Sequence, residues 1–161
     1  MHASRAALLI HEQRPFMTNS KVDEALAYWD RIGGTSRTPA RIEFDPCHIP
    51  QLLPHVVFMK VIDGGRDFQF RVIGDAARSF FFENYTGRLL GDLSHIDPDG
   101  PLIENLREAV RTGRPVRRPV EYVGPLKNFR KLDEVMLPLS GEGGAVTHLL
   151  TILDLAGDRT Y

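Results

Sequence analysis

The sequence contains a single cysteine, Cys47, among its 161 residues. One thiol cannot form an internal disulfide bond, nor a metal site built from several cysteines. The absence of disulfides is compatible with a reducing compartment, so we expect a cytoplasmic protein. Cys47 lies upstream of the first expected strand, and we expect it to be a buried or half-buried structural thiol.

Long apolar segments and an excess of charge of either sign are also absent. The apolar run at residues 6–10 is too short for a signal peptide, and no segment approaches the ~20 apolar residues of a membrane span. The 20 basic and 21 acidic side chains leave a net charge of −1, without the basic excess that phosphate contacts need. We therefore expect a soluble protein that neither binds nucleic acid nor crosses a membrane.

Catalytic and metal-binding patterns are missing as well. The six histidines are scattered, with no pair at helical spacing that would bring two ligands to one metal ion. No G-x-S-x-G motif is present, and Asp97, close to Ser94-His95, is better explained as the cap of the following helix. We expect no catalytic residues and no metal site.

An amphipathic helix is expected near the N-terminus. Residues 20–23 form a capping box of the form S-x-x-D, and Gly33-Gly34 ends the segment. Between them, apolar residues recur at spacings of three and four: Val22, Ala25, Leu26, Trp29 and Ile32. This stripe either packs on the core or forms a dimer seam, for which Val22, Leu26 and Trp29 are the interface candidates. Residues 1–15 could form a further short helix, so we treat 1–34 as a helical extension, not an independent domain, of a main domain at 35–161.

The rest of the chain alternates strand and helix signals. Strands at 55–62 and 67–73 would form a hairpin, with Phe68, Phe70 and Val72 on one face and Arg71 on the other. Short helical pieces fill 74–93, a longer helix begins near Pro101 and ends at Gly113, and strands follow at 116–123, 129–139 and 146–155. This order predicts an α+β fold: an antiparallel sheet with short helices on one face and a cavity between them.

The element order resembles the PAS fold, a five-stranded antiparallel sheet clasped by short helices. Several motifs resemble a bacterial PAS-like family typical of alphaproteobacteria, over about residues 20–155. These motifs are Tyr28-Trp29-Asp30-Arg31, Gly33-Gly34, Pro39-Ala-Arg41, Asp45-Pro46-x-x-Ile49, Leu53-Pro54, Phe68-x-Phe-Arg71-x-x-Gly74 and Thr86-Gly87-Arg88.

The resemblance implies a sensory module that binds a small molecule or a partner protein. PAS domains usually drive an attached effector domain, whereas this chain ends soon after its last expected strand. We therefore expect a stand-alone member whose output is a separate signalling protein. Haem-binding PAS domains use a histidine in the long helix and photochemical flavin domains a cysteine on a central helix. Neither residue stands there, so haem and photochemical flavin are not expected, and the cofactor, if any, is unknown.

An aromatic cluster gives the candidate ligand pocket. Three consecutive rings, at 80–82, cannot all be buried on one face of a turning backbone. One of them would point at the cavity or at a partner; the alternative is two core rings and one partly exposed ring. The pocket candidates are Phe58, Phe70, Arg71, Phe80, Phe81 and Tyr85.

The sequence thus favours a stand-alone PAS sensory or adaptor module in bacterial signal transduction, and the dimer seam described above would make it a homodimer. Two alternatives stay open. One is a small cavity enzyme of the isomerase or dehydratase kind, for which Asp75 and His95 are the candidate acid/base pair. The other is a structural adaptor with a filled core and no ligand.

Overall fold

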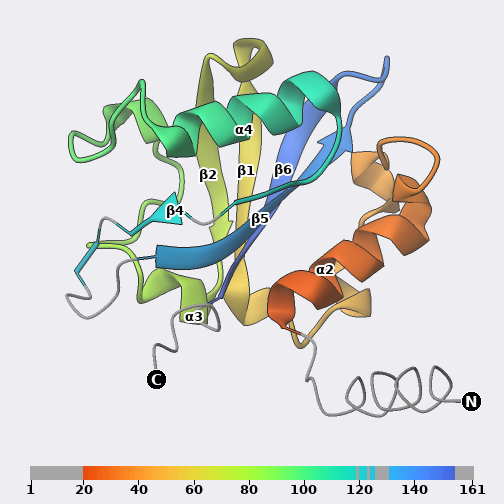
Figure 1. The fold of residues 1–161 in the computed structure, drawn as a ribbon, viewed down its shortest axis with the longest axis horizontal. Coiled ribbons are helices and arrows are strands. Elements are labelled where there is room, and N and C mark those ends of the chain that lie inside the picture. The colour runs from red at the N-terminus through yellow and green to blue at the C-terminus, as the bar shows by residue number, and fades with distance from the viewer. Residues whose placement is uncertain (1–19, 119, 123, 126–130, 155–161) are drawn as a thin grey trace, which may run out of the picture.

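The computed structural model describes residues 20–118, 120–122, 124–125 and 131–154 (Figure 1). The helix considered for residues 1–15 lies outside these ranges. The division at residue 34 stays a prediction.

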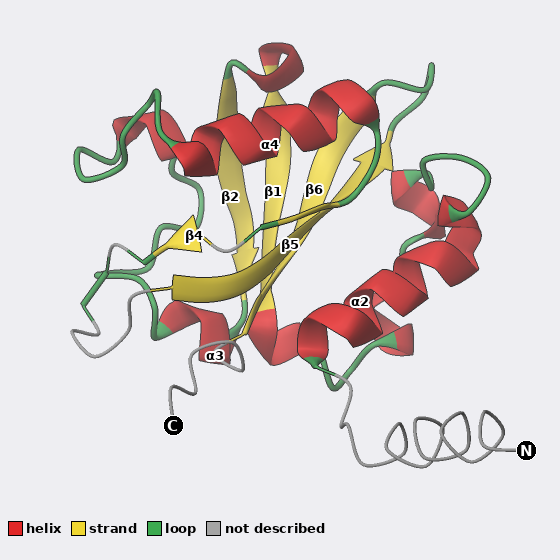
Figure 2. Cartoon of the chain, in the orientation of Figure 1, coloured by secondary structure: helices red, strands yellow, loops and turns green. Residues whose placement is uncertain are grey.

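An antiparallel sheet forms the centre of the fold (Figure 2). Its strand order is β2-β1-β6-β5-β3, with β4 also pairing with β5. The expected hairpin and the two long C-terminal strands are confirmed, while the strand expected at 116–123 is divided into two short pieces that share the β5 edge. The bounds are β1 (Val56–Ile62), β2 (Asp67–Ile73), β3 (Val116–Arg117), β4 (Val120–Glu121), β5 (Lys131–Ser140) and β6 (Val146–Asp154).

Helix α4 (Pro101–Thr112) covers one face of the sheet, which we call the α4 face (Figure 1). Its buried residues follow the spacing expected from the sequence: Ile103, Leu106 and Ala109. Gly113 ends the helix at φ 64°, a left-handed conformation that glycine adopts without strain. The short helix α3 (Asp75–Arg78) and a 3₁₀ turn (Leu90–Asp92) belong to the segment that completes this layer.

Helix α2 (Lys21–Trp29) covers the opposite face, the α2 face, and runs into a π-helical turn (Asp30–Gly34). Ser20 caps it, because its hydroxyl accepts a hydrogen bond from the Asp23 amide at 3.1 Å. The indole of Trp29 is buried, and its Nε1 donates to the Pro138 carbonyl at 2.8 Å. A Cβ at Gly34 would lie 2.0 Å from that ring, so only glycine fits there. Three 3₁₀ turns extend this layer: Arg41–Glu43, Pro46–His48 and Leu53–His55.

The three interface candidates lie on α2, on the side that packs against the sheet. Val22 and Trp29 are buried in the chain's own core on the α2 face, and Leu26 is half-buried against the same cluster. The structure therefore uses the stripe for packing on the sheet, the first of the two alternatives. Val22 and Trp29 are inaccessible to a partner while α2 stays docked.

Successive residues of β5 point alternately into the two cores, one on each face of the sheet. Its residues Val135, Leu137 and Leu139 are buried on the α2 face. Leu132 and Met136 are buried on the α4 face, and Glu134 lies between them at the same two-residue spacing. A carboxylic acid therefore stands within an otherwise apolar row.

A bulge in β2 changes the expected alternation. Met59 pairs with Phe70 and Phe58 pairs with Val72, so Arg71 is the extra residue. Val72 is consequently not on the same face as Phe68 and Phe70, as the sequence pattern suggested, and it is 53% exposed. The bulge also removes Arg71 from regular alternation.

Candidate ligand cavity

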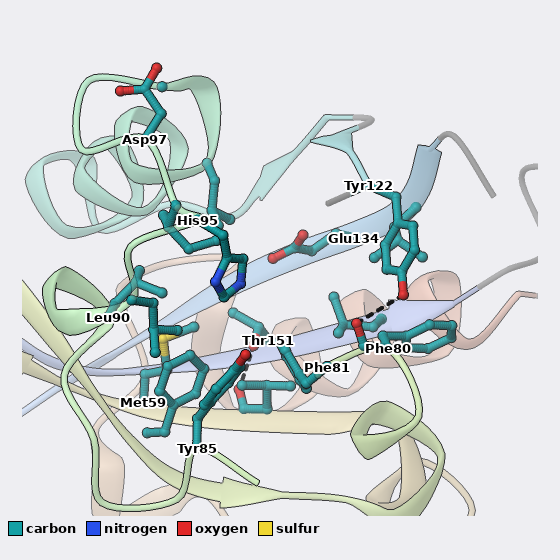
Figure 3. A pocket seen from close by; sticks show the side chains of 18 of the residues that line it. Met59, Phe80, Phe81, Tyr85, Leu90, His95, Asp97, Tyr122, Glu134 and Thr151 are labelled. Atoms are coloured by element: carbon teal, nitrogen blue, oxygen red, sulfur yellow. Dashed lines mark hydrogen bonds between the residues drawn. The ribbon is translucent and has the colours of Figure 1, made fainter. Parts of the chain in front are cut away.

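A cavity of about 270 Å³ lies between the α4 face of the sheet and the segment that connects β2 to α4 (Figure 3). Its wall is mostly apolar and aromatic, with side chains from β1, β2, β5, β6 and that connecting segment. The main apolar residues are Val57, Met59, Phe70, Phe80, Phe81, Tyr85, Leu90, Leu93, Ile96, Leu102, Leu132 and Leu153.

Two hydroxyl groups on the wall already have backbone partners. The Tyr122 hydroxyl donates to the Phe80 carbonyl at 2.9 Å (Figure 3). The Thr151 hydroxyl donates a short hydrogen bond to the Val57 carbonyl across the β1–β6 pair. Each hydroxyl has only one proton to donate, and that proton is used in the bond to the backbone. These bonds hold the wall together.

Glu134 is the exceptional group of the cavity. Its side chain points from β5 into the space enclosed by the other lining residues (Figure 3), and the residue is only 6% exposed. Within the described part of the chain, its carboxyl has no hydrogen-bond or ion-pair partner. Burial raises the pKa of this carboxyl to about 7, because a charge in an apolar site loses its hydration. Near neutral pH the group is therefore poised between its acid and its carboxylate form.

His95 and Asp97 add polar groups at the cavity rim. The imidazole of His95 makes edge contact with Phe82 at 5.2 Å and lies 6.0 Å from the Tyr85 ring. Asp97 is exposed and its carboxylate points away from the other labelled side chains (Figure 3). It accepts a hydrogen bond from the Asp99 amide, as expected for a turn before α4.

Four of the six predicted pocket residues line the cavity: Phe70, Phe80, Phe81 and Tyr85. Phe80 is buried, Phe81 is half-buried and Phe82 is 56% exposed, so the consecutive rings divide as their geometry requires. Two of the three serve the cavity, and the third reaches the surface.

Phe58 and Arg71 are not part of the cavity. Phe58 lies on the α2 face, where its ring stacks on Phe44 and on His148 at centroid distances of 5.8 and 5.3 Å. Arg71 is exposed at the bulge. Burial, followed by the charges of Arg41, Lys60 and Arg71, lowers the pKa of His148. Arg71 therefore belongs to a basic surface region near His148, whereas Phe58 is a buried core residue of the α2 face.

The structure also gives the positions of the cysteine, of the acid/base candidates and of the groups that could bind a metal. Cys47 is exposed, not buried or half-buried as we expected, because it lies in a 3₁₀ turn whose side chains point outward. Asp75 is exposed and absent from the cavity wall, so the structure does not bring the acid/base pair of the enzyme hypothesis together; only His95 lines the cavity. In the described ranges, no group of three or more His, Cys, Asp or Glu residues could hold a metal ion.

The cavity residues that sequence reasoning missed come mainly from the central strands. Glu134 adjoins the apolar residues 135–139 of β5, and Thr151 stands inside the apolar run of β6; both segments are buried on both sides of the sheet. A glutamate next to such a run was a usable signal, because an ionisable group is rarely fully buried without a partner.

A family model described as a PAS domain matches residues 17–116. The chain belongs to the PAS domain family. None of the curated proteins matches the chain. The matched residues include α2, β1, β2 and α4 and thus most of the apolar cavity wall, whereas Glu134 and Thr151 lie beyond them. Membership indicates a sensory or signalling module, and among the described helices none is long and apolar enough to cross a membrane.

Proposed function

We propose that this protein is a PAS sensory module that binds a small molecule in the cavity on the α4 face and passes the change to a partner protein. The observation that carries the proposal is the cavity itself, with its apolar wall and one carboxyl that has no partner among the described residues. Concave, largely apolar sites with few polar groups are typical of small-molecule binding. The bacterial and cytoplasmic setting expected from the sequence is part of this proposal.

The contacts of α2 provide a route from the cavity to the opposite surface. Strands β5 and β6 carry cavity residues on one face and α2 contacts on the other. The Lys21 amide donates to Asp154 at 3.1 Å, and Arg117 joins Asp23 of α2 to Asp133 of β5 at 2.6 and 3.0 Å. A ligand that displaces β5 or β6 would therefore move the α2 layer, where a partner could sense it.

A titration with indole, a neutral apolar probe, tests whether the cavity accepts ligands. Backbone NMR shifts of the purified protein should change saturably at Val57, Met59 and Thr151. Leu93→Phe, which adds a ring to the cavity wall, should weaken indole binding about tenfold or more, since it occupies the same space. Ile42→Ala, at a highly exposed residue on the other side of the molecule, is the control.

Native mass spectrometry of the freshly purified protein adds a second readout, since a retained small molecule would appear as a mass increment lost on unfolding. Failure of indole and of every other apolar probe tested to bind, or equal indole binding by the wild type and Leu93→Phe, would contradict the proposal. Either result would favour a structural adaptor with no ligand.

A further inference from the structure

The lone carboxyl of Glu134 gives the cavity a chemical preference. An ionisable side chain that is 94% buried would ordinarily be paired, since burying a charge without a partner is strongly unfavourable. In this protein no described residue pairs with it. The polar atoms beside it on the wall, the Tyr122 and Thr151 hydroxyls, donate to backbone carbonyls.

The charges around the cavity favour a cation over an anion. The lining residues include Glu134 and Asp97, but among the described residues of the wall there is no lysine or arginine. The first residues of α4 add about half a positive charge from the helix N-terminus. That partial charge is smaller than the full charge of one carboxylate, so an anionic ligand would meet net repulsion once Glu134 ionises.

The volume limits the size of the ligand. About 270 Å³ lies just below the ~300–1,000 Å³ range of typical ligand pockets, and it exceeds the ~150 Å³ that accommodates one benzene ring. The ring centroids of Phe70, Phe81 and Tyr85 lie 5.7–5.9 Å from one another. This aromatic wall suits a flat or aliphatic apolar body.

We propose that the ligand is a small apolar amine, whose hydrocarbon body fills the cavity and whose protonated nitrogen pairs with the carboxylate of Glu134. This inference rests on the proposed ligand-binding function and names the chemistry of the ligand. The protonated amine is the ion-pair partner that Glu134 does not have among the described residues, so the pair forms only in the bound state. An alcohol of the same shape would fill the cavity without supplying the charge.

The protonation of Glu134 makes binding depend on pH. With a pKa of about 7 for the free protein, about a tenth of the carboxyls are ionised at pH 6 and about nine tenths at pH 8, so amine affinity should rise about tenfold between them. Binding at pH 6 should release about 0.9 proton, because the amine arrives protonated and Glu134 must lose its proton. The other titratable groups on the cavity wall are Tyr85, His95, Asp97 and Tyr122.

Calorimetry with three matched probes tests the inference on the full chain. The probes are 2-phenylethylamine, the neutral 2-phenylethanol and the anion phenylacetate, each at pH 6 and pH 8. We expect the amine to bind at least about tenfold tighter than the alcohol at pH 8, and phenylacetate to bind weakest. Glu134→Gln should reduce amine affinity to that of the alcohol, leave the alcohol within about threefold of the wild type, and abolish the pH dependence. Glu142→Gln, at an exposed glutamate outside the cavity wall, is the control and should retain both the preference and its pH dependence.

The outcomes separate this inference from the proposed function. If the alcohol binds as tightly as the amine, or if Glu134→Gln leaves the amine unaffected, the amine inference is wrong and the cavity remains a ligand site. Phenylacetate as the tightest probe would also overturn the inference, since Glu134 would then act as a neutral hydrogen-bond donor. If neither indole nor any of the three probes binds, the proposed ligand-binding function fails together with the inference.

Discussion

The two faces of one sheet are built differently in this protein. The α2 face is filled by large side chains with almost no exposure, among them Trp29, Leu137 and Leu139. The α4 face contains a cavity of about 270 Å³ and a buried carboxyl that pairs with none of the described residues. A cavity and an unpaired acid both lower stability. The comparison indicates that the α2 face stabilises the fold, while the α4 face gives up stability at the cavity that we propose as a ligand site.

Truncating one aromatic side chain on each face should reveal the difference between the faces most clearly. Trp29→Ala should lower the free energy of unfolding by about 3–5 kcal/mol, because it removes a fully packed indole and its hydrogen bond to Pro138. Phe81→Ala removes a half-buried ring at the cavity wall and should cost less than half as much. Urea unfolding measures both. Equal losses would contradict a filled α2 face and a hollow α4 face.

Neutralising Glu134 should stabilise the protein above neutral pH. The pKa of this acid rises from 4.5 in the unfolded chain to about 7 in the fold. The folded state thus holds one more proton between these values, and stability falls as the pH rises through that window. From 1.36 kcal/mol per pH unit, Glu134→Gln should gain up to about 3 kcal/mol at pH 8 and almost nothing at pH 4.5.

The control for that experiment is Glu142→Gln, in the exposed turn between β5 and β6. It should leave the pH profile of unfolding unchanged. A Glu134→Gln variant that is destabilised at pH 8 would mean that the carboxyl has a stabilising partner in the folded protein.

Enlarging one leucine on each face tests the free space directly. Leu137→Phe on the α2 face should cost about 1–3 kcal/mol, because a filled core must distort to admit a ring. Leu93→Phe at the cavity wall should cost less than about 1 kcal/mol, since the added ring can enter existing space. Thermal unfolding of the two variants measures both costs. A larger cost for Leu93→Phe than for Leu137→Phe would show that the cavity is closed in solution.

The smallest expected effect comes from an exposed carboxyl with a partner. Arg37 holds Glu43 through two hydrogen bonds at 2.6 and 2.7 Å, and this pairing lowers the pKa of Glu43 to about 2. Its stabilisation is therefore present above pH 4.5 and is lost as the pH falls toward 2. Solvent limits it to less than about 1 kcal/mol. Glu43→Gln should thus be slightly destabilising at pH 7, opposite in sign to Glu134→Gln; a loss of several kcal/mol would contradict this contrast.

Much of the fold was predictable because its signals are local. The capping box at Ser20, the stripe of α4 and the turn between β1 and β2 each depend on a few neighbouring residues. The aromatic part of the site was also predictable, because three adjacent rings and Tyr85 cannot all face outward. Of these, Phe80, Phe81 and Tyr85 line the cavity.

The remaining features depend on contacts that no local pattern records. The bulge at Arg71 arises from the pairing of β2 with β1, and it moves Val72 away from the face of Phe70. In β5, each alternating set combines apolar residues with one acidic residue, Asp133 or Glu134, so the pattern could not tell which set faces the cavity. Glu134 was missed for this reason, although a glutamate in that strand is the residue on which the amine inference depends.

Carbon NMR of the Glu134 carboxyl tests the account most directly. The side chain can be assigned by comparison with Glu134→Gln and titrated with and without saturating 2-phenylethylamine. We expect a pKa of about 7 in the free protein, falling below about 6 when the amine is bound, because a nearby cation favours the carboxylate. An ordinary pKa near 4.5 in the free protein, or a value that saturating amine leaves unchanged, would contradict the account.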